Sequence, residues 1–174
     1  MLYEPRHTFD KPTGRLNYFL CAILIFVADQ VSKNAIVSSM RLESSIPLIP
    51  GFFHLTFIMN SGGSFGFLKD RISVFITINI VVLIVIFRLV FYSRSINNLV
   101  KTLLGVITGG ALGNLSDRIQ YGAVVDFLDF RGIWRYIFNV ADMAVVCGSI
   151  ALALVFLFDA WMPGKGSPKH LNTK

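Results

Sequence analysis

Residues 105–142, GVITGGALGNLSDRIQYGAVVDFLDFRGIWRYIFNVAD, place four aspartates between two segments that are apolar enough to lie in lipid. The four are Asp117, Asp126, Asp129 and Asp142. An ionised carboxylate next to hydrocarbon costs free energy unless it faces water, a partner or a reaction, so acids at a membrane boundary are candidates for function. We therefore expect this stretch to hold the chemistry of the protein and the rest of the chain to position it.

The whole chain has the composition of a membrane protein. Of its 174 residues, 54% are hydrophobic and only 15% are charged, which is far more apolar than an average soluble domain. The net charge of +6 does not indicate nucleic-acid binding, because the basic residues flank the apolar segments, where anionic lipid headgroups attract them. The chain is predicted to be a single integral membrane domain over residues 1–174 that contacts membrane lipids and binds no nucleic acid.

Four charge-free segments predict four transmembrane helices. Each segment is somewhat shorter than the roughly 20 residues that cross the hydrocarbon core, but long basic side chains and aromatic residues at its ends extend it into the headgroup layer. The segments are residues 16–28, 72–87, 102–116 and 143–158. The predicted fold class is an all-α membrane protein whose four spans place both termini on the same side of the bilayer.

The distribution of basic residues indicates which side this is. Nine of the 16 Lys and Arg residues lie in the amino-terminal segment, the second connection and the carboxy-terminal tail, while most of the acids lie on the opposite side or at its boundary. By the positive-inside rule, both termini are expected in the cytoplasm. Residues 163–174 then form a flexible cytoplasmic tail, and the four aspartates lie near the outer face of the membrane.

The first outer connection, residues 37–71, is too long to be a structureless loop. Residues 52–59 have strand-like composition, and Asn60-Ser61-Gly62-Gly63 supplies turn residues before an aromatic segment at 64–67. We therefore predict a small extracytoplasmic β-rich subdomain between the first and second helices. Its strand edge would pair with an extended peptide, or its aromatic residues would simply anchor the loop at the membrane surface.

Helical spacing brings further residues together on single faces. Asp29 and Lys33 lie four positions apart and are expected to form an ion pair at the outer end of the first helix, where they would brace a site or simply seal the boundary. Gly105, Gly109 and Gly113 also repeat every four residues. Small residues at this spacing let membrane helices approach closely, so this face of the third helix is expected to pack against a neighbour.

Polar residues gather at the outer end of the third helix and at the start of the fourth. Asn114, Asp117 and Arg118 share one helix face, where Arg118 is expected to neutralise Asp117. Asn139 is a plausible N-cap for the fourth helix and places Asp142 at the third helical position, as in a capping box. The positive end of the helix dipole stabilises an ionised carboxylate there, so Asp142 is a candidate base as well as a candidate cap.

Two carboxylates that face each other in a poorly hydrated site share one proton, because both cannot ionise cheaply. One then serves as a base and the other as an acid, which suits the attack of water on a peptide carbonyl. The sequence offers no competing Ser–His or Cys–His pairing and no cluster with metal-ligand spacing, so neither a metal nor another cofactor is expected. Spacing does not say whether Asp117, Asp126 or Asp129 faces Asp142.

Five blocks of the sequence, in this order, resemble the lipoprotein signal peptidases, also called signal peptidase II. The resemblance extends over nearly the whole chain, and five blocks in order are specific where each alone is weak. The blocks are DQVSK at 29–33, NSGGSF at 60–65, GGALGNLSDR at 109–118, VVDF at 124–127 and FNVAD at 138–142. One departure is SGGS at 61–64, where many relatives have Thr-Gly-Ala-Ala after the asparagine, and it concerns loop flexibility and substrate detail.

The resemblance implies a monomeric aspartic endopeptidase of the bacterial inner membrane. Its substrates would be prolipoproteins that already carry a diacylglyceryl group on the cysteine that becomes the new amino terminus, and globomycin-type cyclic peptides would inhibit it. By the family pattern the catalytic pair would be Asp126 and Asp142, and the first outer connection would cradle the substrate. The supporting or substrate-binding residues would be Asn60, Gly62, Asn114, Asp117, Arg118, Asn139, Asp29 and Lys33.

Three other classes of protein remain as alternatives. A small transporter or proton relay would spread its carboxylates through the depth of the membrane, whereas these gather at one boundary. A structural or lipid-binding membrane protein would use the acids only as caps and ion-pair partners. A presenilin-like protease would carry a Gly-x-Gly-Asp motif, which residues 122–126 do not supply.

Overall fold

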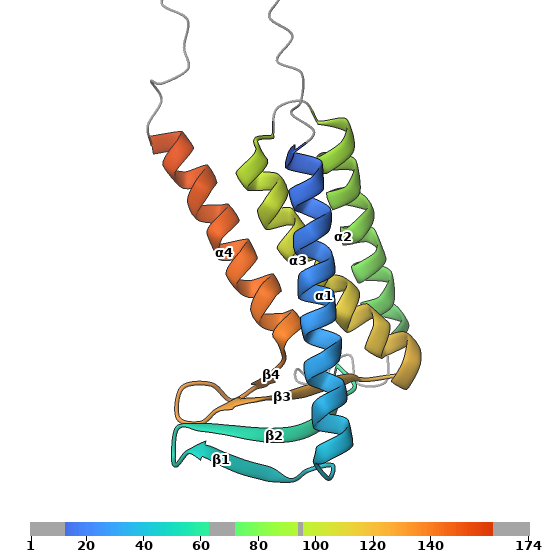
Figure 1. Ribbon diagram of the computed structural model, residues 1–174, viewed down its shortest axis with the longest axis vertical. Helices are drawn as coiled ribbons and strands as arrows, with labels where there is room; N and C mark the ends of the chain where they lie inside the picture. Colours follow the sequence, from blue (N-terminus) through green and yellow to red (C-terminus); the bar gives the residue numbers. More distant parts are fainter. Residues whose placement is uncertain (1–12, 63–71, 94–95, 162–174) are drawn as a thin grey trace, which may run out of the picture.

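The computed structural model describes residues 13–62, 72–93 and 96–161. Four helices lie side by side, and a small sheet lies across one end of the bundle (Figure 1). The first helix begins and the last helix ends at the opposite end of the bundle. The aromatic segment expected at 64–67 and the tail expected at 163–174 lie outside the described residues.

The described helices confirm the four spans that hydropathy predicts. They are α1 (Thr13–Ser39), α2 (Ile72–Tyr92), α3 (Asn98–Tyr121) and α4 (Val140–Trp161), and each is long and apolar enough to cross a bilayer. The largest difference is in α1, which continues well beyond the apolar segment that ends at residue 28. It continues because the polar side chains that follow, including Asp29 and Lys33, are buried and paired inside the protein.

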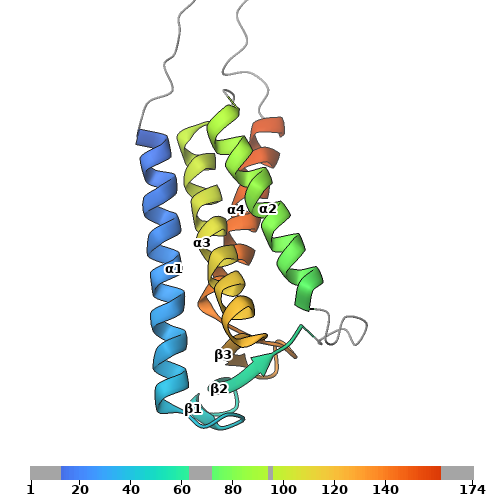
Figure 2. The same ribbon diagram turned by 90° about the vertical axis from the view of Figure 1, so that its right-hand side faces the viewer.

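Helix α3 is the centre of the bundle. Most of its central span is buried, whereas α2 and α4 expose most of theirs, as expected of helices that face lipid. The small residues of α3 allow this: a Cβ added at Gly105 would collide with the backbone carbonyl of Tyr18, and one added at Gly109 would collide with that of Ala22. The close packing expected of this glycine face is therefore present, and α1 is the helix that it contacts (Figure 2).

The sheet has four antiparallel strands in sequence order: β1 (Ser45–Ile49), β2 (Phe53–Asn60), β3 (Val124–Phe130) and β4 (Ile137–Phe138). The hairpin β1–β2 lies in the connection where β structure was predicted. The prediction of a subdomain confined to that connection is corrected, because β3 and β4 come from the connection between α3 and α4. The acids at 126 and 129 interrupt the apolar pattern by which β3 could have been predicted, although Val124, Val125 and Phe127 of this strand are buried.

Strand β3 follows the end of α3 after two residues. Gly122 caps this helix end: it adopts a left-handed conformation with φ of 68° and donates its N–H to the carbonyl of Arg118. Buried Val125 and Phe127 of β3 then pack with Phe57 of β2 and Ile36 of α1 in one apolar cluster. This cluster attaches the sheet to the bundle and holds Asp126, which lies between the two packed residues, against the helix ends.

Candidate active site

Asn139, immediately before α4, connects the carboxyl of Asp126 to the backbone of Asp142, the two residues that the family pattern pairs. Its side-chain oxygen accepts a hydrogen bond of 2.8 Å from the backbone N–H of Asp142, so it caps the helix as expected. Its amide nitrogen donates to Oδ1 of Asp126 at 2.6 Å. Because the N–H of Asp142 can only donate, the oxygen of Asn139 must face it, and the NH₂ group must face Asp126. The buried Asn139 therefore fixes the carboxyl of Asp126 relative to the start of α4, the helix that carries Asp142.

A second asparagine holds the other oxygen of Asp126. This carboxyl lies on β3, paired in register with Ile58 of β2, and is only 1% exposed. Asn60, at the end of β2, donates its amide to Oδ2 of Asp126 at 2.8 Å. The N–H of Gly62 donates to the oxygen of Asn60 at 2.9 Å, which fixes the amide in that orientation. Gly62 has a φ of 88° and lies against the ring of Phe75, so a side chain would fit there poorly.

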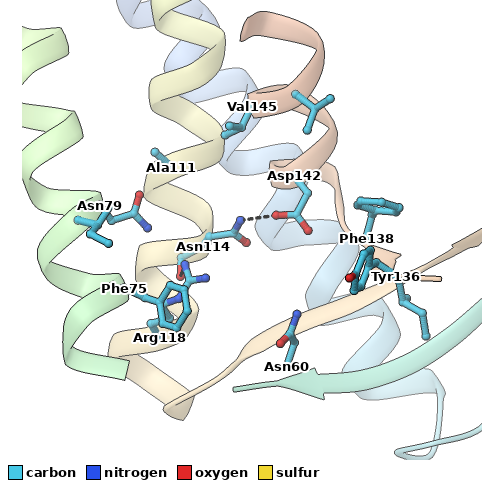
Figure 3. A pocket seen from close by; sticks show the side chains of 13 residues that line it. Asn60, Phe75, Asn79, Ala111, Asn114, Arg118, Tyr136, Phe138, Asp142 and Val145 are labelled. Carbon is cyan, nitrogen blue, oxygen red and sulfur yellow. Dashed lines mark hydrogen bonds between the residues drawn. The ribbon is translucent and has the colours of Figure 1, made fainter. Parts of the chain in front are cut away.

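A third asparagine holds Asp142. Asn114 of α3 donates its amide to Oδ1 of Asp142 at 2.7 Å, as Figure 3 shows. Its oxygen accepts from Nζ of Lys33 at 3.0 Å and from the amide of Asn139 at 3.1 Å. Asp142 thus bonds to α3, and the reciprocal bond of a capping box is absent from the described hydrogen bonds. Since Lys33 carries only donors, it determines which end of the Asn114 amide faces the acid.

A buried ion-pair network lies behind these asparagines. Nζ of Lys33 lies 2.8 Å from Oδ2 of Asp29, the pair expected from spacing, and 2.9 Å from Oδ2 of Asp117. Asp29 also accepts the backbone N–H of Ala141 at 2.9 Å, and Asp117 accepts that of Val125 at 3.0 Å. The network therefore ties α1 and α3 to the residues that immediately precede the two central acids in the chain.

Gln30 is a member of this network that the sequence reasoning missed. Its amide nitrogen lies 3.2 Å from Oδ2 of Asp29 and 3.1 Å from Oδ1 of Asp117, and so bridges the two acids that Lys33 neutralises. The sequence does contain a feature that could have indicated this role. Gln30 is an uncharged polar residue directly after Asp29, in the helix where the spacing of Asp29 and Lys33 predicts an ion pair.

The expectation that Arg118 neutralises Asp117 is corrected, because Lys33 takes that place. Arg118 instead donates to the backbone carbonyl of Asn114 at 3.3 Å, and its guanidinium carbon lies 5.4 Å from the centre of the Phe75 ring. Its side chain borders a pocket together with Asp142. The guanidinium therefore faces the open side of the site.

Of the three acids that spacing left as partners for Asp142, Asp126 is the one that the described structure brings to it. Asp117 is turned towards Lys33, as above. Asp129 accepts from Thr56 at 2.7 Å and from Arg131 at 3.0 Å, on the sheet. Burial alone would raise the pKa of Asp129, but these two hydrogen bonds hold it below its ordinary value. Asp129 is therefore an ionised, structural carboxylate.

Asp126 has the opposite electrostatic character. Burial raises the pKa of its carboxyl to about 7, and the negative charge of Asp142 contributes in the same direction. The hydrogen bonds from Asn60 and Asn139 favour the ionised form and only partly offset this. A carboxyl that titrates near neutral pH beside a second carboxyl is suited to hold and release a proton.

A pocket of about 470 Å³ opens onto Asp142 between three helices and the sheet. Side chains of α2, α3, α4, the end of β2 and the segment around β4 line it, and Figure 3 shows Asp142 and Asn114 bordering the space that faces Phe75 and Asn79. A second pocket of about 270 Å³ continues along the sheet past Asn60, Tyr136 and Ile137. Within the described residues, no group of three His, Cys, Asp or Glu is placed to hold a metal ion.

Four apolar helices with a buried polar site at one end define a multi-pass membrane protein, and two solved structures of bacterial membrane enzymes share the fold. One superimposes with a TM-score of 0.79 at 30% identity, covering 87% of this chain and 94% of its own. The other gives a TM-score of 0.76 at 32% identity, covering 82% of this chain and 93% of its own. The fold is therefore that of a multi-pass bacterial membrane enzyme.

Sequence comparison specifies the family. Residues 21–158 match the family model described as signal peptidase (SPase) II. The lipoprotein signal peptidase of Moorella thermoacetica is 41% identical over 148 residues, which cover 85% of this chain and 97% of that protein. That of Halothermothrix orenii is 43% identical over 141 residues, covering 80% and 94%. The chain belongs to the signal peptidase II family.

Proposed function

We propose that this protein is an aspartic endopeptidase that removes signal peptides from diacylglyceryl-modified prolipoproteins, with Asp126 and Asp142 as its catalytic pair. Membership of the family supports a protease that cleaves lipoprotein signal peptides. The observation that supports the pair is the set of three asparagines that hold these two acids beside a pocket lined by Asp142, Asn60 and Asn114.

The reaction begins with one proton on the pair. Asp126, with a pKa raised to about 7, holds this proton, and Asp142 is ionised. Asp142 takes a proton from a water molecule whose oxygen attacks the scissile carbonyl carbon, while Asp126 gives its proton to the carbonyl oxygen. When the tetrahedral intermediate collapses, the C–N bond breaks, and the proton on Asp142 passes to the amine of the lipidated cysteine. Return of the remaining proton from the new carboxyl group restores the pair.

The surroundings of the pair suit a lipidated substrate. The pocket is reached between membrane-spanning helices, so the signal peptide and the acyl chains would remain in lipid, while the mature chain would leave along the sheet. In this proposal the sheet faces the outside of the cell, both termini lie in the cytoplasm, and globomycin-type cyclic peptides compete for the same pocket. Arg118, on the pocket wall, would offset the negative charge that develops there.

The test is a cleavage assay on a synthetic diacylglyceryl-prolipoprotein in detergent micelles. Asp126→Asn and Asp142→Asn are each expected to lower turnover by at least 10² to 10⁴-fold, on the order of what a positioned acid or base contributes. Asp129→Asn is the matched control, because Asp129 lies on the same strand but bonds to Thr56 and Arg131. Full activity in Asp126→Asn would exclude this pair. So would a result in which Asp117→Asn abolishes cleavage while Asp126→Asn does not.

A further inference from the structure

Asn79 is a polar residue of α2 that has no role in the proposed catalytic pair or among the residues that hold the pair in place. It lies seven residues from the start of this helix, or about 10 Å along its axis. Its neighbours in the helix are almost all apolar. An amide at this position in a membrane-spanning helix requires an explanation, because a polar group without a hydrogen-bond partner in an apolar environment is destabilising.

The side chain of Asn79 faces the active-site pocket. It lines this pocket on the α2 wall, whereas Asn114 and Asp142 lie on the α3 and α4 walls. Figure 3 shows its amide pointing from α2 towards α3, at a height between Ala111 and Asn114. Within the described part of the chain, neither its oxygen nor its nitrogen has a hydrogen-bond partner. This differs from Thr77 of the same helix, which bonds to the carbonyl of Ser73.

The geometry points to Asn79 as a substrate-binding residue that hydrogen-bonds the peptide backbone of the signal peptide close to the scissile bond. This inference rests on the proposed function. A protease substrate must leave the helical conformation to expose its scissile bond, which frees backbone N–H and C=O groups within the bilayer, where no water satisfies them. Asn79 offers an NH₂ group that donates and a carbonyl oxygen that accepts, which together match the C=O and N–H of the peptide backbone.

The signal-peptide side of the substrate fits this position better than the other parts do. The mature chain leaves towards water, where its backbone is hydrated, while Asn79 lies within a helix that spans the membrane. The ester groups of the diacylglyceryl moiety carry only acceptors, so they would leave the oxygen of Asn79 without a partner. The amide therefore acts as the hydrogen-bonding site of an otherwise apolar wall, next to Phe75 and Ile78.

The experiment compares Asn79→Leu with the wild type and with Thr77→Val in the micellar cleavage assay. Leucine keeps the branching at Cγ but cannot form hydrogen bonds. We expect KM to rise roughly 3- to 20-fold, as for hydrogen bonds between membrane helices, with kcat changed less than about twofold. Thr77→Val also removes a polar group from α2, outside the pocket, and should leave KM unchanged. The thermal unfolding of Asn79→Leu in micelles should be unchanged or shifted to higher temperature.

Substrates with ester-linked and ether-linked diacylglyceryl groups distinguish the two carbonyl sources. If Asn79 bonds to the peptide, the variant loses affinity equally for both substrates. If Asn79 instead bonds to the lipid esters, the wild type has a lower affinity for the ether-linked substrate than for the ester-linked one, while Asn79→Leu binds both equally. This result would overturn the inference. A wild-type KM in Asn79→Leu, or lower thermal stability with unchanged KM, would also overturn it, while cleavage by the wild type keeps the proposed function intact.

Discussion

At the scale of single residues, the site is organised by groups that can only donate a hydrogen bond. Lys33, the N–H of Gly62 and the N–H of Asp142 each bind the oxygen of one asparagine. Each asparagine is thereby oriented with its NH₂ group towards a carboxyl oxygen. Asp126 is buried, and burial raises the pKa of its carboxyl to about 7 although the amides of Asn60 and Asn139 favour its ionised form.

The pH dependence of cleavage follows from the raised pKa of Asp126. With a pKa of about 7, Asp126 is protonated at lower pH and loses its proton at higher pH, so activity that requires one proton on the pair should fall as pH rises through about 7. Asn60→Ala removes a donor that favours the ionised form, and the pKa should rise further. We expect the alkaline limb of kcat/KM to move up by about one pH unit.

The control for this shift is Thr56→Val, which removes a hydrogen bond to Asp129 on the same sheet and leaves the bonds to Asp126 in place. Its alkaline limb should coincide with that of the wild type. An alkaline limb in Asn60→Ala that stays in place, or moves to lower pH, would contradict the assigned role of Asp126.

Lys33 is expected to be more important for folding than any exposed ion pair of this protein. Lys33→Met leaves Asp29 and Asp117 buried without their cation, and breaking a buried pair in this way costs about 3–5 kcal/mol. Arg131→Met is the control, because the Arg131 side chain is 47% exposed and such pairs contribute about 1 kcal/mol or less. Unfolding by denaturant in micelles measures both, and equal losses would contradict the role given to Lys33.

At the scale of elements, the contact between α1 and α3 determines whether the site can assemble. Lys33 of α1 reaches Asn114 of α3 because the glycine face lets the two backbones approach closely. The sheet is the second requirement, since it carries Asp126 and Asn60 against the ends of the helices. The proposed catalytic pair is thus divided between one strand and one helix, and neither element holds it alone.

Gly109→Val tests the helix contact. The new side chain would collide with the carbonyl of Ala22 and with Ile25 of α1, and overpacking of this kind costs about 1–3 kcal/mol. We expect a lower unfolding temperature in micelles and reduced cleavage, because separation of the helices displaces Lys33. Leu112→Val, at a partly exposed position of α3, should change neither quantity, and a Gly109→Val protein as stable as the wild type would show that the contact is loose.

At the scale of the whole molecule, the proposed catalytic pair lies at the end of the bundle that carries the sheet, while α1 begins and α4 ends at the other end (Figure 1). This arrangement suits an enzyme whose substrate is anchored in the membrane and whose product leaves on the outer side. The proposed orientation agrees with the excess of Lys and Arg in the amino-terminal segment, the second connection and the carboxy-terminal tail of the sequence.

Single cysteines test this orientation, in a background in which Cys21 and Cys147 are replaced by alanine. Leu48→Cys, on exposed β1, should react with a membrane-impermeant maleimide in intact spheroplasts. Trp161→Cys, at the end of α4, should react only after the membrane is permeabilised. The reverse pattern of labelling would place the sheet in the cytoplasm.

The sequence by itself determined the number of helices, the hairpin of the first connection, the boundary that collects the acids and the family. These follow from local patterns, because hydropathy, turn residues and motif blocks are each read within a short segment. The pairing of Asp29 with Lys33 and the cap at Asn139 could also be predicted from local sequence, because in each case the two partners lie within about one helical turn.

Helical spacing left the partner of Asp142 open, and the family pattern implied Asp126. Only the tertiary structure decided how Asn139 connects these two residues, which cation neutralises Asp117, and that β3 and β4 complete the sheet. Helical spacing favoured Arg118, one residue from Asp117, but packing of α1 on α3 brings Lys33 there from 84 positions away. Strand β3 likewise pairs with β2 across a distance in sequence that includes two whole helices. Such contacts depend on how buried surfaces from distant parts of the chain fit together. The short segment of sequence around each partner therefore does not predict them.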